Sequence, residues 1–186
     1  MVEKRYRDAA DSQIILKELM IPSYGNFGGK VHGGVILSLM DKVAYACAAS
    51  HCKSYCVTAS VDKVDFLNPV EVGELLTLYS SVNYTGNTSM EIGIRVVSED
   101  FRSELIKHTN TSYFTMVALD EETKKPTNIP GLILRTDQEI RRYVEGRLRR
   151  KLRRMQRESF SVAKNEIDLI NEVSSLEREN CQVIKI

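Results

Sequence analysis

The feature that constrains this chain most is a glycine-rich loop that runs directly into a long apolar segment, together residues 26–47. From Val35 onward, one row of apolar residues recurs at steps of four, three and four, at Ile36, Met40, Val43 and Cys47. This spacing predicts a helix that begins at Gly33-Gly34. Because most of its surface is apolar, we expect the rest of the chain to cover the helix nearly all round.

Asp41 is out of place on such a helix, because a buried carboxylate is costly unless it is paired or hydrated. Gly33 and Gly34 lack β-carbons, so a ligand can approach the free N–H groups at the positive end of the helix. That arrangement suits a developing oxyanion. Eight residues separate Gly33 from Asp41, which is about 12 Å of helix. If both act on one carbonyl, the spacing predicts a site shared between two chains of a two-fold dimer. The alternatives are a structural hydrogen-bond acceptor at Asp41 and glycines that serve only close packing.

Composition limits the classes of protein that fit. The chain has 186 residues, 42% of them apolar, and a formal net charge of +1. This is enough for one well-buried domain with an extension, and it gives no general field for nucleic acid. The first twenty residues lack the apolar core of a signal peptide, and no apolar run reaches transmembrane length. We therefore predict a cytoplasmic protein.

Three of the four cysteines lie close together, and reduced thiols are the default for such a chain. Zinc is an alternative, because two potential ligands are i, i+4 neighbours and the cluster comprises Cys47, His51, Cys52 and Cys56. The C-x2-C pairs of zinc knuckles are absent, and buried cysteine is a common small apolar filler. We predict no metal.

The chain after the helix alternates between strand patterns and turn signals. Apolar alternation predicts strands in 55–67, with a bulge near residues 62–63, and in 75–84, 90–97 and 105–119. A short apolar run at 14–20 is available as an edge strand. One long helix with an antiparallel meander predicts an α+β fold whose sheet curls around the helix. Two half-wrapped sheets would pair edge to edge, which again favours a dimer.

The composition changes near residue 135, so we divide the chain into a domain at 1–132 and a C-terminal extension at 133–186. Nine arginines and lysines with a thin apolar stripe predict a basic surface helix over 137–158. Its basic face is either simply solvated or contacts phosphate groups of a ligand or polyanion. Apolar residues at steps of three predict a further amphipathic helix, at Ile167, Ile170, Val173 and Leu176.

Several motifs in order are specific enough to indicate a family, and they cover residues 14–132. They are Asn26 to Asp41, Ala48-Ala-Ser-His51-Cys52, Val57-Thr-Ala-Ser-Val-Asp62, Phe66-Leu-Asn-Pro-Val70, Gly73-Glu74, Gly86-Asn-Thr-Ser-Met-Glu91 and Phe114-Thr-Met-Val-Ala-Leu-Asp120. The chain resembles the hotdog-fold acyl-CoA thioesterases, the family of the bacterial YciA-like enzymes and brain acyl-CoA hydrolase. The resemblance implies a central helix wrapped by an antiparallel sheet, dimers with sites at their interface, and commonly a hexameric trimer of dimers.

The resemblance also implies roles for residues. The loop asparagine and the mid-helix aspartate that work on the thioester match Asn26 and Asp41. The N–H groups of Gly33 and Gly34 stay the expected oxyanion donors, from the position of the glycines at the helix start. Coenzyme A (CoA) would follow two segments and two arginines: Thr58, Ala59 and Ser60; Gly86, Asn87, Thr88 and Ser89; Arg149 and Arg150. No cofactor is implied, since CoA is part of substrate and product. The expected reaction is hydrolysis of fatty acyl-CoA to free acid and CoA.

Two other functions fit the same pattern. A hotdog enoyl- or hydroxyacyl-CoA hydratase-dehydratase would use His32 as its acid-base group, although an aspartate with an asparagine suits hydrolysis better. A non-catalytic acyl-CoA-binding protein is the other, but residues 1–25 are too short for a helix-turn-helix. Binding of nucleic acid through the basic extension is not expected.

Overall fold

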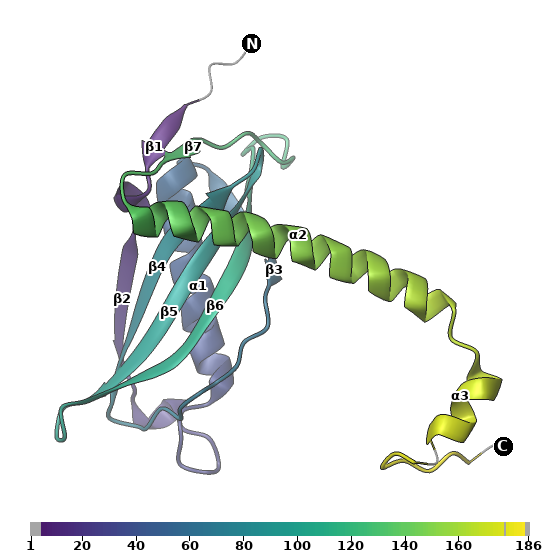
Figure 1. The fold of residues 1–186 in the computed structure, drawn as a ribbon. Helices are drawn as coiled ribbons and strands as arrows, with labels where there is room; N and C mark the ends of the chain where they lie inside the picture. The colour runs from purple at the N-terminus through teal and green to yellow at the C-terminus, as the bar shows by residue number, and fades with distance from the viewer. Residues whose placement is uncertain (1–4, 177, 185–186) are drawn as a thin grey trace. The chain divides into compact units, whose positions relative to one another are not determined.

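A curled antiparallel sheet forms the body of the protein (Figure 1). The computed structural model describes residues 5–176 and 178–184. The five strands of the sheet lie in the order β2-β4-β5-β6-β3. Their bounds are β2 Ile14–Leu19, β3 Tyr55–Val61, β4 Leu75–Thr85, β5 Ser89–Asp100 and β6 Leu105–Leu119. The meander and the early edge strand predicted from the sequence are confirmed.

The bulges that bend this sheet do not lie where the sequence pattern put one. β3 ends at Val61, and its register against β6 shifts between Thr58 and Ser60, so the predicted bulge at 62–63 is wrong. A second shift lies between Val82 and Tyr84, and a third follows Val96, where Thr109 has no register partner on β5. Each unpaired residue bends its strand and increases the twist, which helps the sheet to curl.

Helix α1, Gly33–Cys52, lies against the concave face of the sheet. It begins at the predicted residue. Its buried side chains pack on the apolar residues of β4, β5 and β6, and comprise Ile36, Leu39, Met40, Val43, Ala44, Cys47, Ala48 and His51. The opposite side of α1 is exposed as far as Tyr45, at Gly34, Leu37, Ser38, Asp41, Lys42 and Tyr45. The sequence analysis expected the rest of the chain to cover this helix nearly all round, and that expectation is wrong for the single chain. We call these six exposed residues the open stripe.

A small second sheet was not anticipated. β1, Tyr6–Asp8, pairs in parallel with β7, Gly131–Ile133. Strands of three residues carry too little alternation to be recognised in a sequence. Short 3₁₀ turns at Ala10–Ser12 and Pro22–Tyr24 complete the N-terminal part. The pairing ties the start of the chain to the segment that precedes the C-terminal helices.

Two helices follow: α2, Asp137–Asn165, and α3, Leu169–Leu176. The predicted basic helix is confirmed and extends beyond residue 158. Contacts divide the chain into two units, the first ending at Gly146 inside α2 and the second beginning at Arg147. The domain boundary after residue 132 stays a prediction.

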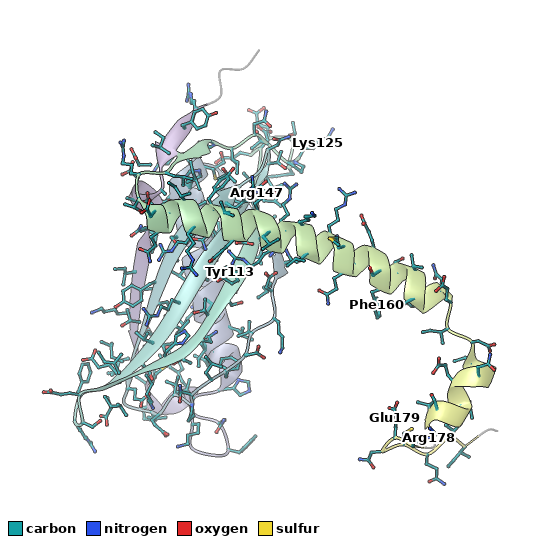
Figure 2. All side chains as sticks on the ribbon, viewed as in Figure 1. Tyr113, Lys125, Arg147, Phe160, Arg178 and Glu179 are labelled. Atoms are coloured by element: carbon teal, nitrogen blue, oxygen red, sulfur yellow. The ribbon has the colours of Figure 1, made fainter. Side chains whose placement is uncertain are left out.

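The first turns of α2 lie over the sheet face turned away from α1, where the rings of Tyr143 and Tyr84 are 5.0 Å apart (Figure 1). Within the second unit, the side chain of Phe160 projects from α2 and is exposed (Figure 2). Across the described ranges, the helices are either too short or too polar to cross a lipid bilayer.

Candidate active site

The glycine loop is shaped by the side chain of Asn26. Its carboxamide oxygen accepts hydrogen bonds from the N–H groups of Gly28, at 2.8 Å, and Lys30, at 3.1 Å. Its backbone N–H donates to the Lys30 carbonyl, and Gly29 turns the loop with a φ of +77°, which glycine adopts without strain. The Asn26 oxygen thus serves the loop rather than the helix start. The NH2 group of the exposed Asn26 side chain is the group that can face a ligand.

His32 caps the first turn of α1. Its Nδ1 accepts a hydrogen bond from the Gly34 N–H at 2.9 Å, so the neutral ring carries its hydrogen on Nε2. A β-carbon at residue 34 would lie 2.9 Å from the same nitrogen, which explains the second glycine. The Gly34 N–H is therefore already occupied. Within the part of the chain that the structure describes, the Gly33 N–H has no acceptor, and the ring of Phe66 lies beside this glycine.

Asp41 lies on the open stripe of α1, two turns beyond the glycines. The Thr58 hydroxyl on β3 donates to Asp41 Oδ1 at 2.6 Å and also lies 3.4 Å from the sulfur of Met116. The side chains of Asp41 and Thr58 are both exposed in the single chain. The expectation that Asp41 is a buried carboxylate is therefore wrong for the single chain. The hydrogen bond fixes one carboxylate oxygen and leaves the other open. Sequence analysis assigned Thr58 to CoA and did not anticipate its contact with Asp41.

One chain does not bring the two halves of the site together. Asn26 and Gly33 lie at the start of α1, and Asp41 lies about 12 Å further along the same axis. A thioester carbonyl that accepts from Gly33 is therefore out of reach of a water activated by Asp41 of the same chain. Asn26 and Asp41 are nonetheless exposed and Gly33 is partly exposed, so each half of the site is open to solvent.

The residues predicted for CoA fall into three places. Thr58, Ala59 and Ser60 line the outer part of β3 at its bulge, beside Asp41. The turn of Gly86, Asn87, Thr88 and Ser89 joins β4 to β5 and is held by N–H groups of Ala118 and Ile129, near the end of α1 rather than its start. Arg149 and Arg150 lie on α2 beyond Gly146, in the unit that is described separately.

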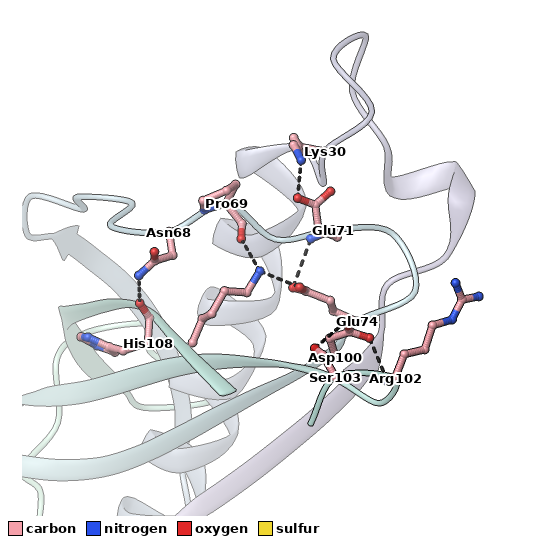
Figure 3. Close-up of polar contacts among 10 residues, drawn as sticks. Lys30, Asn68, Pro69, Glu71, Glu74, Asp100, Arg102, Ser103 and His108 are labelled. Carbon is pink, nitrogen blue, oxygen red and sulfur yellow. Dashed lines mark hydrogen bonds and ion pairs between the residues drawn. The ribbon is translucent and has the colours of Figure 1, made fainter. Parts of the chain in front are cut away.

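A polar network anchors the glycine loop to the sheet (Figure 3). Lys30 forms an ion pair with Glu71, and the Val31 N–H donates to the Val70 carbonyl at 2.9 Å. Behind them, the almost fully buried carboxylate of Glu74 accepts from Lys107 Nζ at 2.6 Å and from the Glu71 N–H at 3.1 Å. Lys107 also donates to the Pro69 carbonyl, at 3.2 Å. Sequence analysis missed this network, and the signal available was a glutamate placed among apolar residues after Gly73.

The cysteine cluster has no metal-binding geometry. Over the described residues, no group of three or more His, Cys, Asp and Glu side chains could hold a metal ion. The thiol of Cys47 donates to the Ser12 carbonyl at 3.1 Å, and burial raises its pKa to about 12. The thiols of Cys52 and Cys56 lie 3.2 Å apart.

Comparisons with known proteins bear on the fold and the family of this chain. The family model of the thioesterase superfamily matches residues 28–104. The chain is 50% identical to protein VdlD of Helicobacter pylori over 77% of this chain and 82% of that protein. It also matches the crystal structure of an apo-hexameric acyl-CoA thioesterase with a TM-score of 0.79 and 35% identity, covering 82% of this chain and 97% of that one. The chain belongs to the hotdog-fold acyl-CoA thioesterases. The predicted fold and family are confirmed.

A further member of this thioesterase family is informative about residues. An acyl-CoA hydrolase of Staphylococcus aureus, solved with butyryl-CoA and CoA, matches with a TM-score of 0.74 and 29% identity, covering 87% of this chain and 99% of that one. It was also solved as three variants in which an asparagine, an aspartate and a threonine are each replaced by alanine. The spacings between those three residues, fifteen and then seventeen positions, equal the spacings between Asn26, Asp41 and Thr58.

Proposed function

We propose that this thioesterase hydrolyses fatty acyl-CoA to free acid and CoA at a site shared between two subunits. The observation that carries the proposal is the placement of two complementary half-sites at two levels of one helix, both open to solvent. Asp41 with Thr58 forms one half, and the Gly33 N–H with Asn26 forms the other, about 12 Å away along α1. Two helices packed side by side about a two-fold axis would bring unlike halves together twice. The open stripe, which mixes apolar and small residues with Asp41 and Lys42, is the surface that such packing would cover.

The proposed chemistry uses two hydrogen-bond donors, one base and one water. The Gly33 N–H of one subunit polarises the thioester carbonyl, and the partner's Asp41 takes a proton from water as that water attacks. The tetrahedral oxyanion collapses, the C–S bond breaks, and the CoA thiolate takes up the proton. The exposed NH2 of Asn26 orients the water or the carbonyl.

The expected rate contributions of the base and of the oxyanion donor make these two roles testable. General-base help contributes about 10²- to 10⁴-fold, and one oxyanion donor about 10²- to 10³-fold. Direct attack by Asp41 through a mixed anhydride is an alternative with a different signature. If water opens the anhydride at its aspartyl carbonyl, a single turnover in heavy-oxygen water leaves the label in the Asp41 carboxylate, whereas the general-base route puts it only in the released acid.

CoA itself needs backbone donors and cations along its length. We propose that it runs past Thr58, Ala59 and Ser60 towards the Gly86–Ser89 turn, with Arg149 and Arg150 as candidate phosphate ligands. The partners are then the acyl-CoA and further copies of this chain. A dimer satisfies the site, and a trimer of dimers is proposed because a structural neighbour is described as hexameric. Action on soluble CoA esters in the cytoplasm fits this set, without nucleic acid.

The hydratase-dehydratase alternative is weakened by the first turn of α1. His32 would have to act as base through a ring nitrogen, but its Nδ1 is used as the helix cap and its Nε2 carries the hydrogen. A non-catalytic acyl-CoA-binding protein would not need the Thr58–Asp41 pair, which orients a carboxylate on an exposed face.

The test is release of free thiol from a panel of acyl-CoAs, from short to long chains, by the wild type and Asp41→Asn side by side. We expect release by the wild type and a loss of about 10²-fold or more in the variant. Asn26→Ala is the second variant, and Glu121→Gln, an exposed carboxylate in the turn after β6, is the matched surface control. Equal rates in folded wild type and Asp41→Asn would contradict the assignment of Asp41. Hydration of an enoyl-CoA without thiol release would contradict hydrolysis itself.

A further inference from the structure

The hydrolytic site does not use the two cysteines that flank the turn between α1 and β3. Cys52 is the last residue of α1 and Cys56 is the second residue of β3. Their sulfur atoms lie 3.2 Å apart, and each also lies 3.6 Å from the Ser54 carbonyl oxygen in the intervening turn. A disulfide bond is about 2.05 Å long, so the sulfur atoms need to approach by only about 1.2 Å. That approach requires rotation of the two side chains and a slight closing of the turn.

The two thiols are not equivalent. Cys56 is buried, whereas Cys52 is partly exposed. The hydrogen bond from the Cys56 thiol lowers the pKa of Cys52, and that interaction, together with burial, raises the pKa of Cys56. Thiolates react with electrophiles and thiols do not, so the accessible member of the pair is also the reactive one. Cys47 differs, because it is fully buried and its pKa is raised to about 12.

We propose that Cys52 and Cys56 form a reversible dithiol–disulfide couple that reacts with hydroperoxides and reports its state to Asp41 through β3. The Cys52 thiolate attacks the distal oxygen of the hydroperoxide, the O–O bond breaks, and an alcohol or water leaves. The resulting sulfenic acid is attacked by Cys56, which loses its proton, and water leaves as the S–S bond forms. The two thiols are oxidised by two electrons, and the hydroperoxide is reduced by two. An added dithiol reverses the reaction by exchange.

The route to Asp41 is short. Thr58 follows Cys56 by two residues on the same strand, and its hydroxyl holds Asp41 at 2.6 Å. Pulling the start of β3 towards the end of α1 moves this hydroxyl relative to the carboxylate. Weakening of this hydrogen bond to a charged group, short of its complete loss, corresponds to a fall of about tenfold in rate. This last step rests on the proposed function, whereas disulfide formation does not.

The test uses the full chain with Cys181→Ser, because Cys181 is exposed and would cross-link different molecules. We expect mild hydrogen peroxide to remove two free thiols per chain and to link the peptides that contain Cys52 and Cys56, with both changes reversed by dithiothreitol. In Cys56→Ser, a dimedone adduct should accumulate on Cys52. In Cys52→Ser, the partly exposed position, neither adduct nor disulfide should form.

Activity is read in the same samples. A fall of about tenfold that follows disulfide formation, returns with dithiothreitol and is absent from peroxide-treated Cys52→Ser supports the whole proposal. A disulfide without a change in rate overturns the link to Asp41. If the thiols of Cys52 and Cys56 both stay reduced at a peroxide concentration that oxidises the exposed Cys181 of the wild type, the proposed dithiol–disulfide couple is overturned. If the wild type releases no thiol from any acyl-CoA, the proposed function fails, and the peptide and dimedone measurements still decide the thiol chemistry.

Discussion

Mixing two inactive variants tests the shared site directly. In Asn26→Ala every glycine-loop half is damaged, and in Asp41→Asn every carboxylate half is damaged. If one site takes Asn26 from one subunit and Asp41 from the other, a mixed dimer contains one doubly damaged site and one intact site. Random reassortment makes about half of the dimers mixed, so about 25% of the wild-type activity should return. The separation of the halves, about 12 Å along α1, is what makes this outcome different from that of a single-chain site.

The assay is thiol release from one acyl-CoA, measured for each variant alone and for an equimolar mixture that has been unfolded and refolded together. Co-expression of the two variants with different affinity tags gives the same mixed dimer without refolding. The control is the double variant mixed with wild type, in which a mixed dimer has no intact site. A mixture of the single variants no more active than its components, although tags show that mixed dimers form, would refute the sharing of the site.

Three further outcomes are expected. Thr58→Val should lower kcat by about ten- to a hundredfold with a small change in KM, because it frees Asp41, whereas a raised KM alone would return Thr58 to CoA binding. Lys107→Met should cost about 3–5 kcal/mol of unfolding free energy in urea, because it strands the buried Glu74 carboxylate, and Glu74→Gln in the same background should recover part of it. Burial lowers the pKa of His51 below its usual 6.5. Below pH 6.5 His51 takes up a proton in the unfolded chain but not in the folded chain, so the free energy of unfolding should fall as the pH drops from about 6.5 towards the folded pKa. The difference between the melting temperatures at about pH 8 and 5.5 should therefore be smaller for His51→Gln than for the wild type.

Sequence patterns predicted the parts of this molecule whose signal is periodic or local. The start of α1 at Gly33, the limits of β6 and the edge strand at 14–20 follow from apolar spacing and glycine, and the structure agrees. The bulge in β3 was misplaced, because one unpaired residue changes the alternation in the same way wherever it falls nearby.

For the candidate site, too, sequence patterns identified single residues but not the contacts between residues far apart in the chain. Asn26 and Asp41 stand out as single residues in an unusual context, so a sequence can nominate them. Two contacts join residues far apart in the chain, so no local sequence pattern predicts them. They are the hydrogen bond from Thr58 to Asp41 and the ion pair of Glu74 with Lys107. The occupation of the Gly34 N–H by His32 depends on a rotamer, which sequence does not specify.

The position of β3 has a consequence for how the protein is made. In the described sheet, β3 pairs with β6 on one side only, and its other edge offers free backbone groups next to the exposed side chains of Tyr55 and Val61. Neither proline nor a run of charge protects that edge, which is the usual defence against unwanted pairing. If the proposed dimer covers this edge, a newly folded chain is most vulnerable to aggregation before it meets its first partner. Assembly is then a matter of protein quality control as well as of catalysis, and yield should depend on how quickly two nascent chains find each other.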